Sequence, residues 1–140
     1  MLEKTLSMIK PDCVSTHVIG KVLNMIETKG FEILGMKQIS LSRKDARRFY
    51  KVHQDKPFFS DLIEFMISGP VIVIALQRDN AIEEYRKLIG ATNPDVAVEG
   101  TVRKLFGHDT QKNCVHGSDS VENGEREVYF FFSERELDLP

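Results

Sequence analysis

An unbroken apolar run, rich in β-branched residues, extends from Val71 to Leu76 and restricts the fold more than any other feature. Gly69-Pro70 stands directly before it and breaks any preceding helix. The run is far too short to cross a membrane, and it is typical of a strand in the centre of a sheet. The rest of the chain is therefore expected to supply neighbouring strands and covering helices.

Hydrophobic spacing and turn residues predict the remaining elements. Further strands are expected over Thr5–Ile9, where Pro11 stops the strand, and over Phe31–Leu41 and Asn113–His116. A first helix is expected from Ile19 to a stop at Gly30, and a second from a Ser42 cap with Asp45 to Tyr50. A third is expected over Asp61–Ser68, and a fourth from an Asn80 cap to Ile89, closed by Gly90. The last is expected from a Ser120 cap to about Phe131. This order predicts an α/β sandwich of two layers, with four strands and helices over one face.

Residues 91–112 have weak periodicity and only a short helical stretch after Thr101. Loops of this length within a compact domain are usually functional.

Length and charge limit the functional classes. The 140 residues are expected to form a single domain, residues 1–140. A net charge of −2 gives no basic excess, so nucleic acid is not an expected partner. Cys13 and Cys114 have neither zinc-site nor CxxC spacing, which suits a reducing compartment. Residues 1–10 carry charges and no apolar core of a signal peptide, so a cytoplasmic protein without membrane contact is expected.

The octamer from Asn113 to Ser120 is built around one histidine, His116. Gly117 leaves room for a bulky substrate beside the imidazole. Ser118, Asp119 and Ser120 stand at an expected helix start, where free N–H groups favour anions. A neutral imidazole in this setting is a plausible phosphoryl acceptor. The alternative is a surface turn whose serine caps a helix.

Several other polar or aromatic residues fall at expected element ends or in loops: Lys10, Tyr50, Phe58, Arg86, Thr92, Arg103 and Asn113. Taken singly, the cations are more often solvated charges and the aromatic residues more often core. A loop arginine such as Arg103 is a better candidate for a phosphate clamp. Walker A and GxGxxG motifs are missing, and His116, Ser118 and Asp119 are too close in sequence for a hydrolase triad.

The whole chain resembles the nucleoside diphosphate kinases. The matching segments are Thr5–Asp12, Pro57–Phe59, Ser68–Val71, Gly90–Pro94, Gly100–Arg103 and Asn113–Ser120, followed by Glu127. The resemblance implies a ferredoxin-like βαββαβ fold with a four-stranded antiparallel sheet covered by helices. It also implies a ping-pong reaction that moves the γ-phosphoryl group of a nucleoside triphosphate to a nucleoside diphosphate and so maintains nucleotide pools.

The resemblance also implies a role for each matching residue. His116 is the nucleophile and carries the phosphoryl group on its pros nitrogen, Glu127 holds the imidazole, and Ser118 hydrogen-bonds the glutamate. The positions that bind phosphates are Lys10, Tyr50, Arg86, Thr92 and Arg103. Lys10 and Asn113 match positions that hold the sugar, and Phe58 with Leu62 matches the base-stacking position. Mg²⁺ is expected to bridge the phosphates, with Asp119 as an outer-shell contact.

Departures from the family pattern include Glu99, Thr110 and Gly124. They leave the nucleophile and its phosphate ligands unaltered but put subunit contacts in doubt, and either a tetramer or a hexamer is consistent with the family. Two other functional classes stay open. An inactive relative would bind nucleotide or protein only, and a ferredoxin-like RNA-binding module would need a basic-aromatic strand that this chain lacks.

Overall fold

The apolar run forms the core of β3 (Val71–Asp79), in a computed structural model that describes residues 1–137. β3 pairs with β1 (Leu2–Ile9) on one side and with β2 (Glu32–Ile39) on the other. The short strand β4 (Val115–Gly117) pairs with β1, which gives the order β2-β3-β1-β4. All three pairings are antiparallel, as the resemblance implies for a ferredoxin-like sheet.

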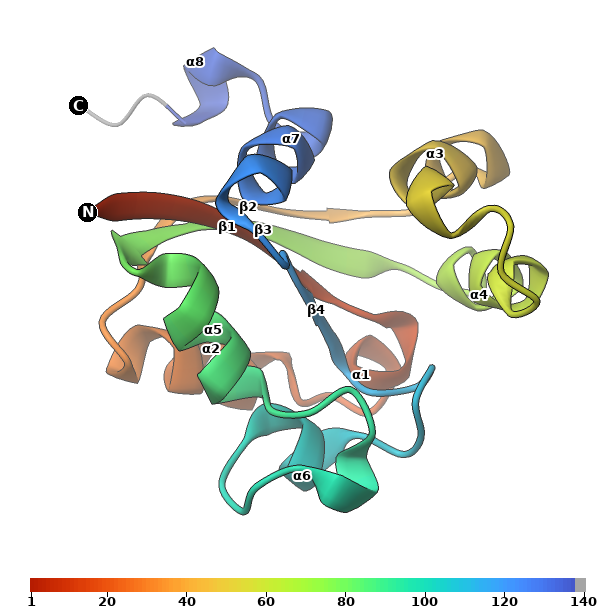
Figure 1. The fold of residues 1–140 in the computed structure, drawn as a ribbon, viewed down its shortest axis with the longest axis horizontal. Helices are drawn as coiled ribbons and strands as arrows, with labels where there is room; N and C mark the ends of the chain where they lie inside the picture. Colours follow the sequence, from red (N-terminus) through yellow and green to blue (C-terminus); the bar gives the residue numbers. More distant parts are fainter. Residues whose placement is uncertain (138–140) are drawn as a thin grey trace.

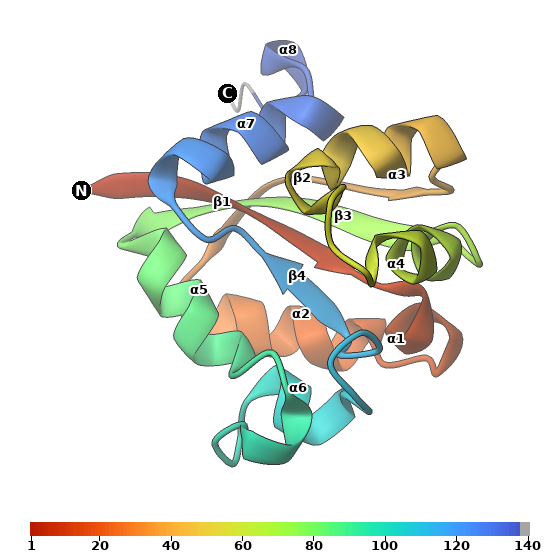
Figure 2. The ribbon, with the colours of Figure 1, turned by 45° about the vertical axis from the view of Figure 1, so that its right-hand side comes forward.

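Helices cover both faces of this sheet, so the expectation of two layers with one covered face is wrong (Figures 1 and 2). One face packs against α3 (Arg43–Phe49), α4 (Phe59–Met66), α7 (Val121–Phe131) and α8 (Glu134–Leu137). The other packs against α1 (Pro11–Ser15), α2 (Ile19–Thr28), α5 (Ala81–Ile89) and α6 (Val102–Phe106). Two separate apolar cores result, one on each side of the sheet.

The side chains of β3 explain why its sequence has no polar alternation. Val71, Val73 and Ala75 belong to the core beneath α7. The residues between them, such as Ile72 and Ile74, belong to the core beneath α5. Because successive side chains of a strand point to opposite faces, a strand covered on both sides needs apolar residues at every position.

Most predicted helix ends are confirmed. The hydroxyl oxygens of Ser42, Thr101 and Ser120 each accept a backbone N–H three residues further on, at 3.0, 3.3 and 3.0 Å. Gly90 closes α5 with a φ of +88°, a conformation that favours glycine. Asn80 precedes α5 as expected, but its backbone is left-handed and its side chain makes no capping hydrogen bond.

Some boundaries differ from the prediction. β1 begins at Leu2 rather than Thr5, because its register with β3 continues to the pair Leu2↔Asp79. α4 covers Phe59–Met66 rather than Asp61–Ser68, since the Leu62 N–H already bonds the Phe58 carbonyl at 2.9 Å. The last strand begins two residues late, at Val115, and α1 was not expected at all.

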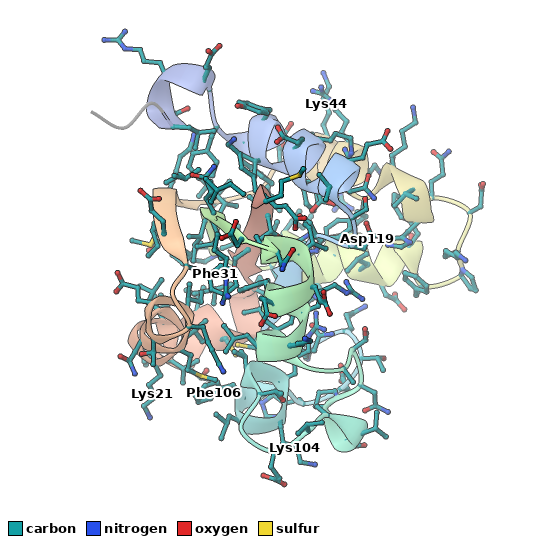
Figure 3. All side chains as sticks on the ribbon, turned by 60° about the vertical axis from the view of Figure 1, so that its left-hand side comes forward. Lys21, Phe31, Lys44, Lys104, Phe106 and Asp119 are labelled. Carbon is teal, nitrogen blue, oxygen red and sulfur yellow. The ribbon has the colours of Figure 1, made fainter. Side chains whose placement is uncertain are left out.

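Charged side chains project from the outer surfaces, whereas aromatic residues fill the layers. Lys21 and Lys44 extend outward from α2 and α3, and Phe31 is buried against the sheet (Figure 3). Strands β3, β1 and β4 and helix α7 together bring the ends of distant segments to one edge, where the site described below forms (Figure 2). Within residues 1–137, no helix combines the length and apolarity needed to cross a membrane.

Candidate active site

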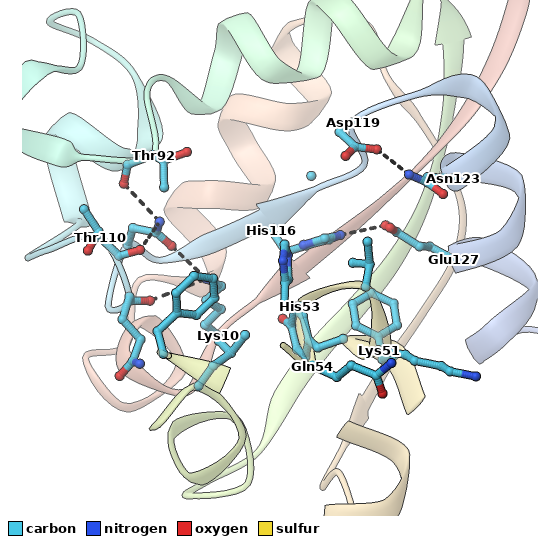
Figure 4. Close-up of a pocket in the computed structure, with 18 of the residues that line it drawn as sticks. Lys10, Lys51, His53, Gln54, Thr92, Thr110, His116, Asp119, Asn123 and Glu127 are labelled. Carbon is cyan, nitrogen blue, oxygen red and sulfur yellow. Dashed lines mark hydrogen bonds and ion pairs between the residues drawn. The ribbon is translucent and has the colours of Figure 1, made fainter. Parts of the chain in front are cut away.

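β4 and α7 place His116 and Glu127 side by side. His116 Nε2 lies 2.7 Å from Glu127 Oε1 (Figure 4). The Ser118 hydroxyl donates to that same oxygen at 2.9 Å. Ser118 is itself fixed, because its oxygen accepts the Leu6 N–H of β1 at 3.0 Å. With a carboxylate on Nε2, that nitrogen carries the proton and Nδ1 keeps its lone pair.

The imidazole is only partly exposed. The side chain of His116 has 19% of its surface accessible and that of Glu127 has 8%. Phe49 and Tyr50 lie edge-on to the ring, with centroids 5.3 and 6.3 Å away. This packing restricts rotation of the ring and leaves one side of it open to a cavity.

The cavity beside His116 has a volume of about 1010 Å³. Every predicted site residue except Ser118 lines it, and Ser118 is buried behind Glu127. The lining residues predicted from the sequence are Lys10, Tyr50, Phe58, Leu62, Arg86, Thr92, Arg103, Asn113, His116, Asp119 and Glu127. The structure therefore brings them together, while their roles in binding and catalysis remain predictions.

Basic side chains outnumber acidic ones on the cavity wall, although the chain as a whole is acidic. The basic residues are Lys10, Arg48, Lys51, Arg86, Arg103 and Arg126, and the acidic ones are Asp55, Asp119 and Glu127. Within residues 1–137, neither Lys10, Arg86 nor Arg103 forms an ion pair with a carboxylate. Cations gathered without counterions favour an anionic ligand.

Lys10 and Arg103 are buried beside each other. Burial, and next the charge of Arg103, lower the pKa of Lys10 to about 8. Burial is also the main cause that lowers the pKa of Arg103, and its guanidinium donates to the Gly90 and Val115 carbonyls at 2.9 and 2.8 Å. A bound phosphate would supply the anionic partner that Lys10 and Arg103 do not have within residues 1–137.

Asn113 links the lysine to the long segment 91–112. Its Oδ1 accepts from Lys10 Nζ at 2.9 Å, and its Nδ2 donates to the Thr92 and Thr110 carbonyls at 3.0 and 3.1 Å (Figure 4). The segment predicted to be functional thus forms one wall of the cavity. Thr110, a departure from the family pattern, is on that wall.

An aromatic side chain stands at the mouth. Phe58 is 47% exposed, while Leu62 beneath it on α4 is buried. His53 packs between Tyr50 and Phe58, with ring centroids 6.5 and 5.6 Å away. The exposed ring of Phe58 offers a face on which a nucleobase could stack.

Asp119 lies near the start of α7. The Asn123 side chain donates to its Oδ1 at 2.6 Å, and this hydrogen bond is the main cause that lowers its pKa (Figure 4). Asp119 is therefore ionised at neutral pH. Residues 1–137 contain no cluster of three or more histidine, cysteine or acidic side chains that could hold a metal ion alone.

Gly117 lines the cavity and also has a packing role that the sequence did not predict. A Cβ atom added there would lie 2.9 Å from Tyr85 Cδ2 and 3.0 Å from Ile89 Cδ1. The missing side chain therefore lets β4 approach α5, while room for a substrate beside the imidazole stays a prediction.

The sequence did not single out several lining residues. His53 and Gln111 lie in segments without regular hydrophobic spacing, so nothing separated them from ordinary loop residues. No motif surrounds Arg48, Lys51 or Arg126 in the sequence, and only the fold turns these side chains toward the cavity.

Comparison with known proteins gives a consistent result. The family model for nucleoside diphosphate kinase matches residues 3–137. A nucleoside diphosphate kinase from Campylobacter lari is 53% identical over 97% of this chain and 99% of that protein, and one from Nitratiruptor is 50% identical with the same coverage of both.

Solved structures agree with the sequence matches. The Aquifex aeolicus nucleoside diphosphate kinase superposes with a TM-score of 0.97 at 38% identity, covering 99% of this chain and 100% of that one. The Halobacterium salinarum enzyme in complex with CDP gives 0.94 at 38% identity, covering 99% of this chain and 92% of the other. From its sequence, its fold and the residues gathered at the cavity, this chain belongs to the nucleoside diphosphate kinase family of enzymes.

Proposed function

We propose that the protein works by a ping-pong mechanism with a phosphohistidine intermediate on His116. The Nδ1 lone pair attacks the γ-phosphorus of a nucleoside triphosphate, and the bond from phosphorus to the β-phosphate oxygen breaks. The nucleoside diphosphate leaves, and a second diphosphate takes the phosphoryl group from Nδ1. The observation that carries the proposal is the 2.7 Å contact of Nε2 with Glu127, which leaves Nδ1 as the free nucleophile.

The surrounding cations support this chemistry. Phosphoryl transfer passes through a loose transition state whose charge is spread over the phosphoryl oxygens. Lys10, Arg86 and Arg103 line the cavity and would stabilise that charge. The CDP found in the Halobacterium salinarum relative supports nucleoside diphosphates as ligands of this chain also. Exchange between different nucleotides would keep the nucleoside triphosphate pools in balance.

The donor set fits Mg²⁺ that arrives with the nucleotide. Mg²⁺ commonly keeps several waters and is held by one or two carboxylates together with substrate phosphates. Asp119 is an ionised carboxylate on the cavity wall, suited to an outer-shell contact. When bound, the ion would neutralise charge on the phosphates.

Labelling with γ-labelled ATP and Mg²⁺ tests the intermediate. We expect an acid-labile, base-stable label on the protein that transfers to added GDP. His116→Ala should take no label and lose at least ~10⁴ in rate, about 5.5 kcal/mol of barrier. His108→Ala, an exposed histidine outside the cavity, is the matched control and should label normally. An unlabelled wild type, as for an inactive nucleotide-binding relative, would refute the mechanism.

We also propose that the protein is a homo-oligomer, a tetramer or a hexamer. β2 is an edge strand of the sheet, and its Met36 is 49% exposed. A second exposed apolar group consists of Val96, Val98 and Leu105. Exposed apolar groups of this kind suit contacts between copies. Light scattering with mass determination would decide, and a monomer at micromolar concentration would contradict the proposal.

A further inference from the structure

A strained turn directly precedes β4. The Val115 N–H donates to the Asn113 carbonyl at 2.9 Å, and Cys114 between them has a φ of +76°. A three-residue turn with this φ is rare and unfavourable for a residue with a side chain. Such a turn persists only where the surrounding structure fixes it. This one lies between Asn113 and His116, which both line the cavity.

The segment from Lys10 to Asp12 fixes this turn from both sides. Asp12 Oδ2 accepts the Cys114 N–H at 3.0 Å, and the Cys114 carbonyl accepts the Lys10 N–H at 2.8 Å. Lys10 then reaches over the turn to Asn113 with its side chain. Asp12 is the only side chain among residues 1–137 that hydrogen-bonds the Cys114 backbone.

The charge of Asp12 acts on the same site. Lys10 is buried among Arg103 of α6, Asp12 of α1, the Cys114 thiol and Asp109 of the long segment. Burial and Arg103 lower the pKa of Lys10, and Asp12 is the largest of the influences that raise it. The second oxygen of the carboxylate, Oδ1, is buried and has no hydrogen-bond partner within residues 1–137. Leaving a buried carboxylate oxygen without a hydrogen-bond partner costs free energy.

We propose that Asp12 is a positioning residue for phosphoryl transfer, whose carboxylate clamps the Cys114 turn and thereby aims the cavity side chains on either side of it. This inference rests on the proposed function. The negative charge also favours the protonated form of Lys10, the form that can bind a phosphate oxygen. Asp12 does not line the cavity, so it is expected to act through the turn and through Lys10 rather than on the substrate itself.

Two substitutions separate the clamp from the charge. Asp12→Asn keeps an oxygen that can accept the Cys114 N–H but removes the charge, and Asp12→Ala removes both. Asp45→Asn is the matched control, because Asp45 occupies the first turn of α3 as Asp12 does that of α1, and it lies outside the cavity. The measurements are kcat and KM across pH, and the pH dependence of Lys10 labelling by an amine-reactive reagent, read by mass spectrometry.

The two variants have different expected results. In the wild type, kcat/KM falls as pH rises through about 8, where Lys10 loses its proton. Asp12→Asn moves that fall, and the onset of Lys10 labelling, to lower pH, with kcat below the fall kept within ~3-fold. Asp12→Ala lowers kcat by ~10–100-fold with a smaller change in KM, since misplacement of the site costs about this much. Asp45→Asn changes neither profile.

Unchanged pH profiles for both kcat/KM and Lys10 labelling in Asp12→Asn would overturn the role of the charge. An Asp12→Ala protein that melts earlier but turns over normally below its melting temperature would overturn the clamp. If Asp12→Ala does not fold, the instability itself shows that the turn needs the clamp, and Asp12→Asn still decides the role of the charge. Lys10 labelling needs no turnover, so it tests this inference even if the phosphohistidine mechanism fails.

Discussion

At the scale of single residues, the Tyr50 hydroxyl is a hydrogen-bond donor available to a ligand. Its hydroxyl is buried and has no hydrogen-bond partner within residues 1–137, although the residue lines the cavity. Burial, and next the charge of Glu127, raise the pKa of Tyr50 far above neutrality. The hydroxyl therefore stays protonated and remains a donor for a phosphate oxygen.

Tyr50→Phe should separate activity from stability. Removing an unpartnered buried hydroxyl leaves the free energy of unfolding unchanged or raises it by about 1 kcal/mol. Loss of a donor to the developing charge lowers kcat by up to ~10²-fold. Urea unfolding and steady-state rates measure the two effects, with Tyr129→Phe, at an exposed tyrosine, as the control. A parallel loss of stability and activity would instead assign Tyr50 a packing role.

Residue types and order were enough to place the members of the site but not their geometry. The resemblance named His116, Glu127 and Ser118, and the hydrogen bonds it implies between these residues are present. The close approach of Gly117 to Tyr85 and Ile89 could not be predicted, because these two residues come from a distant helix. No local pattern reports a contact of that kind.

At the scale of elements, α7 depends on a close approach to β1. A Cβ atom added at Gly124 would lie 2.3 Å from the Lys4 carbonyl oxygen. The glycine that departs from the family pattern, and that costs α7 up to ~1 kcal/mol of helix propensity, is therefore needed for packing. The same contact sets how far Glu127, one turn further along α7, stands from β4.

Gly124→Ala is expected to destabilise the protein in spite of the better helix former. Overpacking against backbone costs ~1–3 kcal/mol, more than the propensity gained. Gly20→Ala on α2 is the matched control, because a Cβ there meets nothing within 4 Å and the gain of up to ~1 kcal/mol should appear alone. Opposite signs in thermal unfolding are expected. A stabilised Gly124→Ala would mean that α7 shifts away from β1 at little cost.

Helix and strand boundaries were predicted well where local hydrogen bonds fix them, and poorly where a distant strand or helix fixes them. The caps at Ser42 and Ser120 are local hydrogen bonds, and they are present. The length of β1 depends on its partner β3, and α1 covers only Pro11–Ser15, too few residues for a periodic pattern. The run at Val71–Leu76 indicates a central strand, and its lack of alternation matches the two covered faces that the structure shows.

At the scale of the whole molecule, the fold concentrates charge that the sequence spreads out. Lys10, Arg86 and Arg103 come from three different parts of the chain and meet at one cavity, while the net charge of the chain is −2. The net charge of a chain says nothing about such local gathering. Lys10 follows β1, while Arg86 and Arg103 lie on α5 and α6, so the packing of α5 against β1, β4 and α6 brings the three together.

Because these cations repel one another in the free protein, an anionic ligand should stabilise the whole fold. ADP at 100 times its dissociation constant adds about 2.7 kcal/mol to the free energy of unfolding, which corresponds to a rise of about 5–10 °C in melting temperature. Adenosine at the same concentration lacks the phosphates and should give a much smaller rise. Added NaCl should weaken the effect of ADP, since salt screens the charges. Differential scanning fluorimetry measures all three conditions. Equal shifts from ADP and adenosine would mean that the base and sugar dominate binding, and that the gathered cations do not hold the phosphates.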